Sequence, residues 1–224
     1  LLKRVQAELG EVVPIEPHFS PRYNPWDQRL CVARDGDLFA VLRSGRASIV
    51  TGGIERFTPS GIRLSSGEEI QADVIVTATG LQPQAMGAIR LTLDGVPIDP
   101  ADTLIYRGVM LSGVPNLIVF WGYINASWTL RSELVASFAC RLIRHMTKKK
   151  LHQCRPMLRE GERSMQRRPL MDGFTPGYVT RNAHLFPKQG DREPWINPQN
   201  VWRDRRSLLG EKLEDGVLVF AGGG

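Results

Sequence analysis

The chain has 224 residues, of which 42% are hydrophobic and 23% charged, a composition typical of folded globular proteins and unlike that of disordered chains. Its three cysteines and four histidines are scattered, which argues against a disulfide framework or a metal site and indicates a reducing, cytoplasmic compartment. No apolar run approaches the roughly 18 residues that a membrane-spanning helix requires.

The net charge of +6 is unevenly distributed along the chain. Residues 141–212 hold 17 Lys and Arg against 7 Asp and Glu. Such a segment could contact nucleic acid, an anionic membrane surface or an acidic partner. Because these charges are dispersed among Pro and Gly, we favour a solvated basic surface, expect no nucleic-acid partner and leave peripheral membrane association open.

The first 45 residues predict two short helices around an ordered loop. Residues 1–9 resemble the end of a helix closed by Gly10, and the absence of an initiator Met suggests a piece of a longer protein. Four prolines forbid a helix across most of residues 11–36, whose large aromatic side chains favour an ordered loop. Residues 38–42 then predict a short helix that Gly45 ends.

Residues 46–80 predict β-structure. Short runs such as "IERFT" and "GIRLSS" are separated by turn residues and predict a β-meander. Residues 74–76 (VIV) do not alternate, which is typical of a strand buried on both faces in a parallel sheet. This strand ends in small residues, Ala78, Thr79 and Gly80, that would let a ligand approach the backbone closely.

A second arrangement of strand, tight loop and helix follows an irregular segment with a hairpin signal at Asp94 and Gly95. Residues 117–121 predict another buried strand, which Gly122 ends. From about Ser127 the apolar residues recur at helical spacing up to residue 146. Residues 147–224 predict little regular structure apart from one last strand in "DGVLVFAGGG".

The two strand ends are candidate ligand sites, because ligands of α/β sheets lie beyond the carboxyl ends of strands and helix N-termini attract electron-rich groups. Two ordinary strand-to-loop turns explain the same pattern. The dinucleotide fingerprint GxGxxG does not occur in the sequence.

"YNPWDQR" is a second candidate site. A Pro-stiffened loop can hold the Arg29 guanidinium in a fixed pose, as a catalytic or phosphate-binding arginine requires. The pattern by itself favours the simpler alternative, in which Arg29 pairs with Asp27 on the surface.

Several stretches taken together resemble the flavin-containing monooxygenases of the Baeyer–Villiger type. They are "HFSPRYNPWDQRLC", "DVIVTATGL", "RGVMLSGVPNLIVFWGYINASWTL", "ACRLIRHM" and "FTPGYVTRNAHLFPKQGDREPW". By the order of these motifs, the chain resembles the C-terminal half of that family. The resemblance implies an α/β fold, part of a flavoprotein with two dinucleotide-binding domains, with a parallel sheet and a β-meander, the sheet being incomplete in this chain.

The resemblance also implies a division of the chain and its cofactors. Residues 1–77 would end the NADPH-binding domain, residues 78–150 would end the FAD-binding domain, and residues 151–224 would form a basic C-terminal extension. The residues implied to contact cofactor are Ala78, Thr79, Gly80, Leu81, Gly122, Asn125, Ala126, Ser127 and Trp128.

The implied reaction inserts one oxygen atom from O2 into a ketone, or oxidises a sulfur compound, through a C4a-peroxyflavin. Arg29 matches the active-site arginine of the Baeyer–Villiger enzymes. Gln28 stands where relatives often carry a lysine that meets NADPH phosphate, so that role is not transferred. The alternative is a truncated, non-catalytic remnant that does not bind FAD alone and whose partner is the missing N-terminal half.

Overall fold

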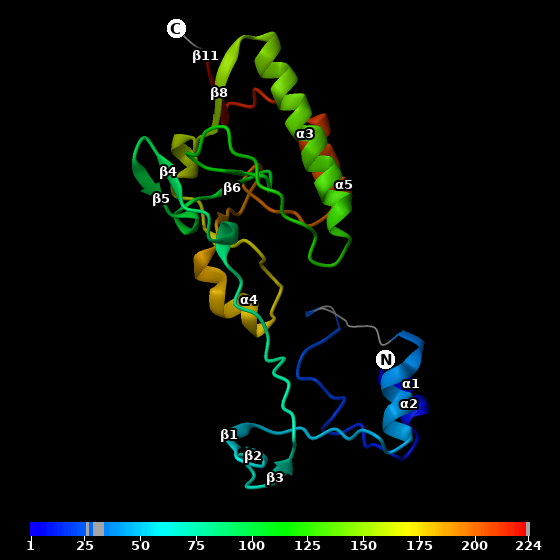
Figure 1. Ribbon diagram of the computed structural model, residues 1–224. Helices are drawn as coiled ribbons and strands as arrows, with labels where there is room; N and C mark the ends of the chain where they lie inside the picture. Colours follow the sequence, from blue (N-terminus) through cyan, green and yellow to red (C-terminus); the bar gives the residue numbers. More distant parts are fainter. Residues whose placement is uncertain (26, 29–33, 223–224) are drawn as a thin grey trace. The chain divides into compact units, whose positions relative to one another are not determined.

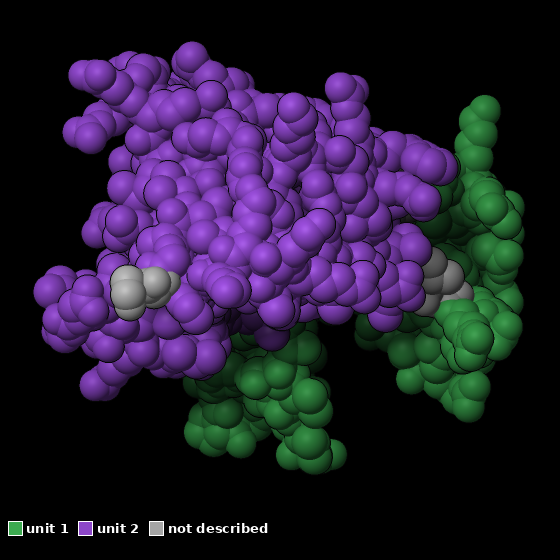
Figure 2. Space-filling view, turned by 90° about the horizontal axis from the view of Figure 1, so that it is seen from above, with its two compact units in different colours: residues 1–80 green, residues 81–224 purple. Residues whose placement is uncertain are grey.

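The computed structural model describes residues 1–25, 27, 28 and 34–222 (Figure 1). The chain forms two compact units, Leu1–Gly80 and Leu81–Gly224, which are coloured separately in Figure 2. Each unit is described by itself.

Two helices open the first unit, as the sequence predicts. Helix α1 (Leu2–Leu9) ends at Gly10, whose φ of 61° lies in the region that favours glycine. Helix α2 (Asp37–Arg43) follows the short 3₁₀ turn η1 (Arg34–Gly36). The two helices contact each other, and each buries one leucine, Leu9 or Leu42.

The predicted β-meander is confirmed. Strands β1 (Ile54–Thr58), β2 (Gly61–Leu64) and β3 (Glu69–Gln71) form an antiparallel sheet in the order β1-β2-β3. Gly61 pairs with Gln71, and a Cβ at Gly61 would overlap the carbonyl oxygen of Ile70. The close approach of β3 to β2 therefore requires glycine at this position.

The predicted parallel sheet is not found. Every sheet among the described residues is antiparallel, and residues 74–76 form no strand. The Val74 and Val76 side chains are 78% and 85% exposed, where burial on both faces was expected. An apolar run becomes a strand only when a neighbouring strand binds its N–H and C=O groups, and no described strand lies beside this one. Residues 117–121 are likewise unpaired as a strand, although the Val119 N–H donates to the Val109 carbonyl at 2.8 Å.

The second unit is built around a 21-residue helix, α3 (Trp128–Lys148), whose predicted start is confirmed. Its buried residues are Arg131, Val135, Phe138 and Leu142, at the spacing of one helix face. This face packs on Tyr106 and Met110, from strands β6 (Ile105–Tyr106) and β7 (Met110–Leu111). Leu130 is one of the apolar residues at helical spacing, but it is 46% exposed, and Arg131 lies inside instead.

Residues 151–224 share this core. Strand β8 (Leu151–Pro156) pairs with β11 (Leu218–Gly222), which confirms the predicted last strand. Cys154, Trp195, Val217 and Leu218 belong to the same apolar cluster as Phe138. The boundary between the two units falls at Gly80–Leu81, and residues 151–224 lie in one unit with residues 81–150.

Shorter elements complete the second unit. Strands β4 (Leu91–Leu93) and β5 (Val96–Ile98) form the hairpin predicted at Asp94 and Gly95, and β9 (Arg168–Pro169) pairs with β10 (Lys188–Gln189). The remaining helices and turns are η2 (Ala85–Ala88), η3 (Pro100–Asp102), η4 (Glu160–Glu162), α4 (Gly177–Asn182), η5 (Ala183–Leu185), α5 (Val201–Arg205) and the π-turn η6 (Arg206–Gly210).

The structure is thus a mixed α/β fold of small antiparallel sheets and a few helices. The domain assignment by cofactor stays a prediction. Among the described helices, none combines the length and apolar character that crossing a membrane requires.

Candidate functional site

The loop of residues 122–128 contains five of the predicted cofactor residues, and the structure brings these five together. The Trp128 indole covers Gly122, and a Cβ at Gly122 would overlap the indole ring. Gly122 was predicted to end the strand and to belong to a loop that approaches the cofactor. In the structure the group that approaches Gly122 is Trp128, whose side chain is 58% exposed.

The N-terminus of α3 lies exposed beside this loop. Ser127 is the N-cap residue, but its side chain makes no capping hydrogen bond and lies 2.6 Å from the Thr129 hydroxyl instead. Asn125 and Ala126 are exposed, and the first turn of α3 contains no acidic residue. The unpaired N–H groups of a first helical turn and the helix dipole together favour an electron-rich group. The start of α3 is therefore suited to an electron-rich group.

A buried ion pair packs against Tyr123 of the loop. The Arg131 guanidinium contacts the Asp204 carboxylate of α5, with Nε 3.2 Å from Oδ2, and both side chains are almost fully buried. The same guanidinium lies 5.5 Å from the centre of the Tyr123 ring, which belongs to the loop. Arg131 thus joins the loop, α3 and α5.

The burial of this cluster also changes its acid–base behaviour. Burial raises the pKa of Asp204, and the Arg131 cation opposes that rise. Burial likewise raises the pKa of Tyr123, and a hydrogen bond to Asp204 adds to this rise. Tyr123 therefore stays a neutral phenol over Arg131 at physiological pH.

Two further contacts hold the same loop. The Ile124 N–H donates to Oε1 of Gln199 at 2.7 Å. Gly108, with a φ of 70°, lies against Arg131, because a Cβ at Gly108 would overlap the guanidinium. The Ile124–Gln199 and Arg131–Asp204 contacts join residues 75 and 73 positions apart in the sequence, which no local pattern could reveal.

The other predicted cofactor residues lie at the connection between the units. Ala78, Thr79, Gly80 and Leu81 are exposed and span the boundary between the two units. Gly80 has a φ of 111° and nothing within 4 Å of a built Cβ. Arg29 lies outside the described residues, as does its alternative pairing with Asp27.

The segment before Arg29 forms a cavity that was not predicted. It has a volume of about 870 Å³ and is lined by residues 16–23 together with Thr51. Nδ1 of His18 lies 2.9 Å from the Thr51 hydroxyl, and the Phe19 ring lies 6.4 Å from the Phe39 ring. These contacts hold residues 18 and 19 against Thr51 and Phe39, as expected for an ordered loop.

Sequence comparison shows close relatives over nearly the whole chain. AlmA of Acinetobacter baylyi, described as a probable FAD-binding monooxygenase, is 46% identical over 221 residues. The FAD-containing monooxygenase EthA is 46% identical over 220 residues in Mycobacterium tuberculosis and 44% identical in Mycolicibacterium smegmatis. Each match covers 98% of this chain but only 44% of the relative.

The other comparisons add no relatives. No family model matches the chain, and no solved structure matches it. The chain spans less than half the length of the curated relatives that it matches.

Proposed function

We propose that the chain belongs to the family of FAD-containing monooxygenases and supplies part of an enzyme that inserts one oxygen atom from O2 into a ketone or oxidises a sulfur compound. The observation that carries this proposal is the 122–128 loop beside the exposed N-terminus of α3. A homologue of FAD-containing proteins that presents unpaired N–H groups there has a place for the electron-rich edge of a flavin ring.

Bound FAD would supply the activation of O2, with NADPH as the electron donor. The chain's own residues would position the ring: Ser127 and Trp128 through the start of α3, and Gly122, Asn125 and Ala126 through the loop. Cofactor contacts would also come from Ala78, Thr79, Gly80 and Leu81, of which the first three are small. Residues 1–77, 78–150 and 151–224 would be the NADPH-domain part, the FAD-domain part and the basic extension.

Arg29 would give the reaction its Baeyer–Villiger character. A guanidinium is positively charged at every physiological pH, so it would stabilise the negative charge that oxygen transfer develops.

A second candidate is a non-catalytic remnant that does not bind FAD alone. It is favoured by the share of each relative that the chain covers and by the lack of a GxGxxG turn in the sequence. Under the first proposal the chain helps to bind FAD and to oxygenate substrate when the rest of such a protein is present, whereas the remnant does neither.

Co-expression separates the two candidates. We expect the purified chain to be colourless, and the chain co-expressed with the unmatched portion of Acinetobacter baylyi AlmA to be yellow and to oxygenate ketones with NADPH. The two portions of AlmA itself, expressed as separate chains, are the control for assembly. If that control is yellow and the mixed pair is colourless, the remnant is the correct assignment, whereas a yellow preparation of the chain alone would contradict the remnant.

Arg29→Ala in the assembled pair tests the reaction type. We expect NADPH to reduce the flavin at an unchanged rate and ketone oxygenation to be lost. Arg22→Ala, a change at an exposed arginine of the same segment, is the matched control. Unchanged ketone turnover in Arg29→Ala would remove Arg29 from the proposed active site.

A further inference from the structure

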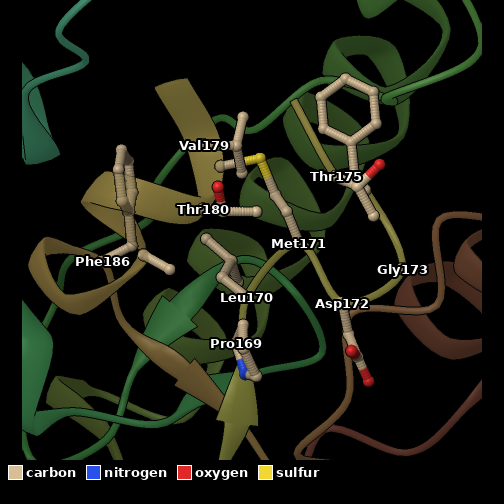
Figure 3. Close-up of a pocket in the computed structure, with 11 residues that line it drawn as sticks. Pro169, Leu170, Met171, Asp172, Gly173, Thr175, Val179, Thr180 and Phe186 are labelled. Carbon is tan, nitrogen blue, oxygen red and sulfur yellow. The ribbon is translucent and has the colours of Figure 1, made fainter. Parts of the chain in front are cut away.

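An apolar cavity of about 250 Å³ lies beside α4 in the second unit (Figure 3). Its walls include Leu170, Met171, Phe174, Val179, Ala183 and Phe186. In Figure 3 the Val179, Met171 and Thr180 side chains lie close together between Phe186 on one side and Thr175 on the other. Residues of α4 and of the segment after β9 thus enclose one space.

The polar groups of the wall already have partners. The Thr180 hydroxyl donates to the Gly177 carbonyl at 3.3 Å, within its own helix. The Asp172 carboxylate pairs with Arg168 at 3.2 Å, and Figure 3 shows it directed away from the other labelled side chains. A ligand in this cavity would therefore meet mostly carbon and would not need to satisfy a buried charge.

The cavity is connected to the 122–128 loop by direct contacts. The Phe186 ring packs edge-on against Trp121, with ring centres 6.0 Å apart, and Trp121 directly precedes Gly122. On the other wall, the Leu170 carbonyl accepts a hydrogen bond from Nδ2 of Asn197 at 3.1 Å. Nε2 of Gln199, whose Oε1 accepts from the Ile124 N–H, donates to Oδ1 of the same Asn197 at 3.3 Å, so a change at Leu170 would alter contacts that hold the loop.

We propose that this cavity is a binding site for a small apolar molecule, of the size of a fused two-ring aromatic or an aliphatic group of about ten carbons. The size follows from a comparison, since a cavity of about 150 Å³ lined by aliphatic and aromatic side chains binds benzene. The site lies below the range of about 300–1,000 Å³ that is usual for drug-sized ligands. The proposal requires no bound flavin and so stands apart from the proposed function.

Naphthalene is a suitable probe, because it has ten carbons and no polar atom. We expect saturable binding to the flavin-free chain in ligand-observed NMR. We also expect the Trp121 indole N–H signal, identified by its loss in Trp121→Phe, to shift as naphthalene is added, because the aromatic probe would lie against Phe186. Absence of saturable binding, or binding without a shift of this signal, would overturn the proposal.

Two cavity-filling variants locate the site. Val179→Phe and Ala183→Leu should each weaken naphthalene binding at least tenfold, because each places new carbon atoms in the cavity. Val96→Phe, at a residue that is 65% exposed in β5, adds the same atoms to the surface and should leave binding unchanged. Circular dichroism checks that each variant is folded. Equal binding in a folded cavity variant and in the control would place the probe elsewhere and refute the assignment.

Discussion

At the scale of single residues, Gly122 shows how one missing side chain shapes the candidate site. The Trp128 indole occupies the space of a Cβ at Gly122. Gly122→Ala would therefore push the indole away or move the loop, and we expect a loss of about 1–3 kcal/mol in the free energy of unfolding. Urea denaturation measures it. The added change Trp128→Ala should restore most of the loss, because the indole is more than half exposed.

A matched control exists for this residue. Gly161→Ala introduces the same methyl group where nothing lies within 4 Å of the built Cβ, so its unfolding free energy should stay close to that of the unmodified chain. If Gly122→Ala and Gly161→Ala change the free energy of unfolding by the same amount, Trp128 does not pack on Gly122 as described.

At the scale of elements, the Arg131–Asp204 pair joins α3 to α5. Arg131→Met would leave the Asp204 carboxylate buried without its cation, and we expect a loss of about 3–5 kcal/mol in the free energy of unfolding. The double variant Arg131→Met with Asp204→Leu should be less destabilised than Arg131→Met, since no uncompensated charge remains. Urea denaturation of the unmodified chain, Arg131→Met and the double variant measures these losses.

The neighbouring surface pair supplies the comparison. Arg203 and Glu193 lie 2.8 Å apart with side chains 55% and 50% exposed. Arg203→Met should change the unfolding free energy by about 0–1 kcal/mol, because water screens an exposed pair. A loss in Arg203→Met as large as that in Arg131→Met would mean that burial does not decide the effect.

Asp215 connects β6 to the turn before β11, and its ionisation makes stability depend on pH. Burial by itself raises the pKa of Asp215. The N–H groups of Leu218 and Val217, the Tyr106 hydroxyl and the Arg107 cation outweigh burial and lower this pKa below its ordinary value. The Tyr106 and Arg107 donors lie 2.7 Å and 2.9 Å from Oδ2.

The sign of the pH effect follows from this lowered pKa. A carboxyl whose pKa is lower in the folded than in the unfolded chain stabilises the fold fully above its unfolded pKa, about 3.9, and loses this contribution as pH falls further. Asp215→Asn should therefore lower stability near pH 7 and reduce the decline below about pH 4. Thermal unfolding from pH 7 to pH 3 tests this, with the exposed residue change Glu68→Gln as control. An unchanged acid decline in Asp215→Asn would contradict it.

At the scale of the whole molecule, the division into two units predicts where a protease cuts first. Residues 73–84 connect the units without regular secondary structure, and Val74, Val76 and Leu81 are 69–85% exposed. Exposed, unpaired backbone is the preferred substrate of proteases. Brief treatment with thermolysin, which cuts beside large apolar residues, should yield two fragments that meet within 73–84, as mass spectrometry can determine. A first cut within the buried segment 104–111 would show that this segment opens more readily than the connection.

The local elements could be predicted from the sequence because each depends on its own residues. The helix from Ser127 follows from the spacing of its apolar residues, whereas the turn at Asp94 and Gly95 and the end of α1 at Gly10 follow from turn and C-cap preferences. The strands expected at 74–76 and 117–121 could not be predicted in the same way, because a strand depends on neighbours that the local sequence does not contain. The core contribution of residues 151–224 escaped prediction for the same reason.

In the candidate site, too, some features depend on local sequence and others on residues that are distant in the chain. The sequence by itself determined the family resemblance, which the relatives confirm, and the cluster of small and polar residues at 122–128. Only the tertiary structure decided that Arg131 lies buried under this loop, that Asp204 and Gln199 hold it, and that Trp128 fills the space over Gly122. A motif records which residues are adjacent in the chain, whereas burial and pairing depend on residues that are distant in the chain and meet only when the unit folds.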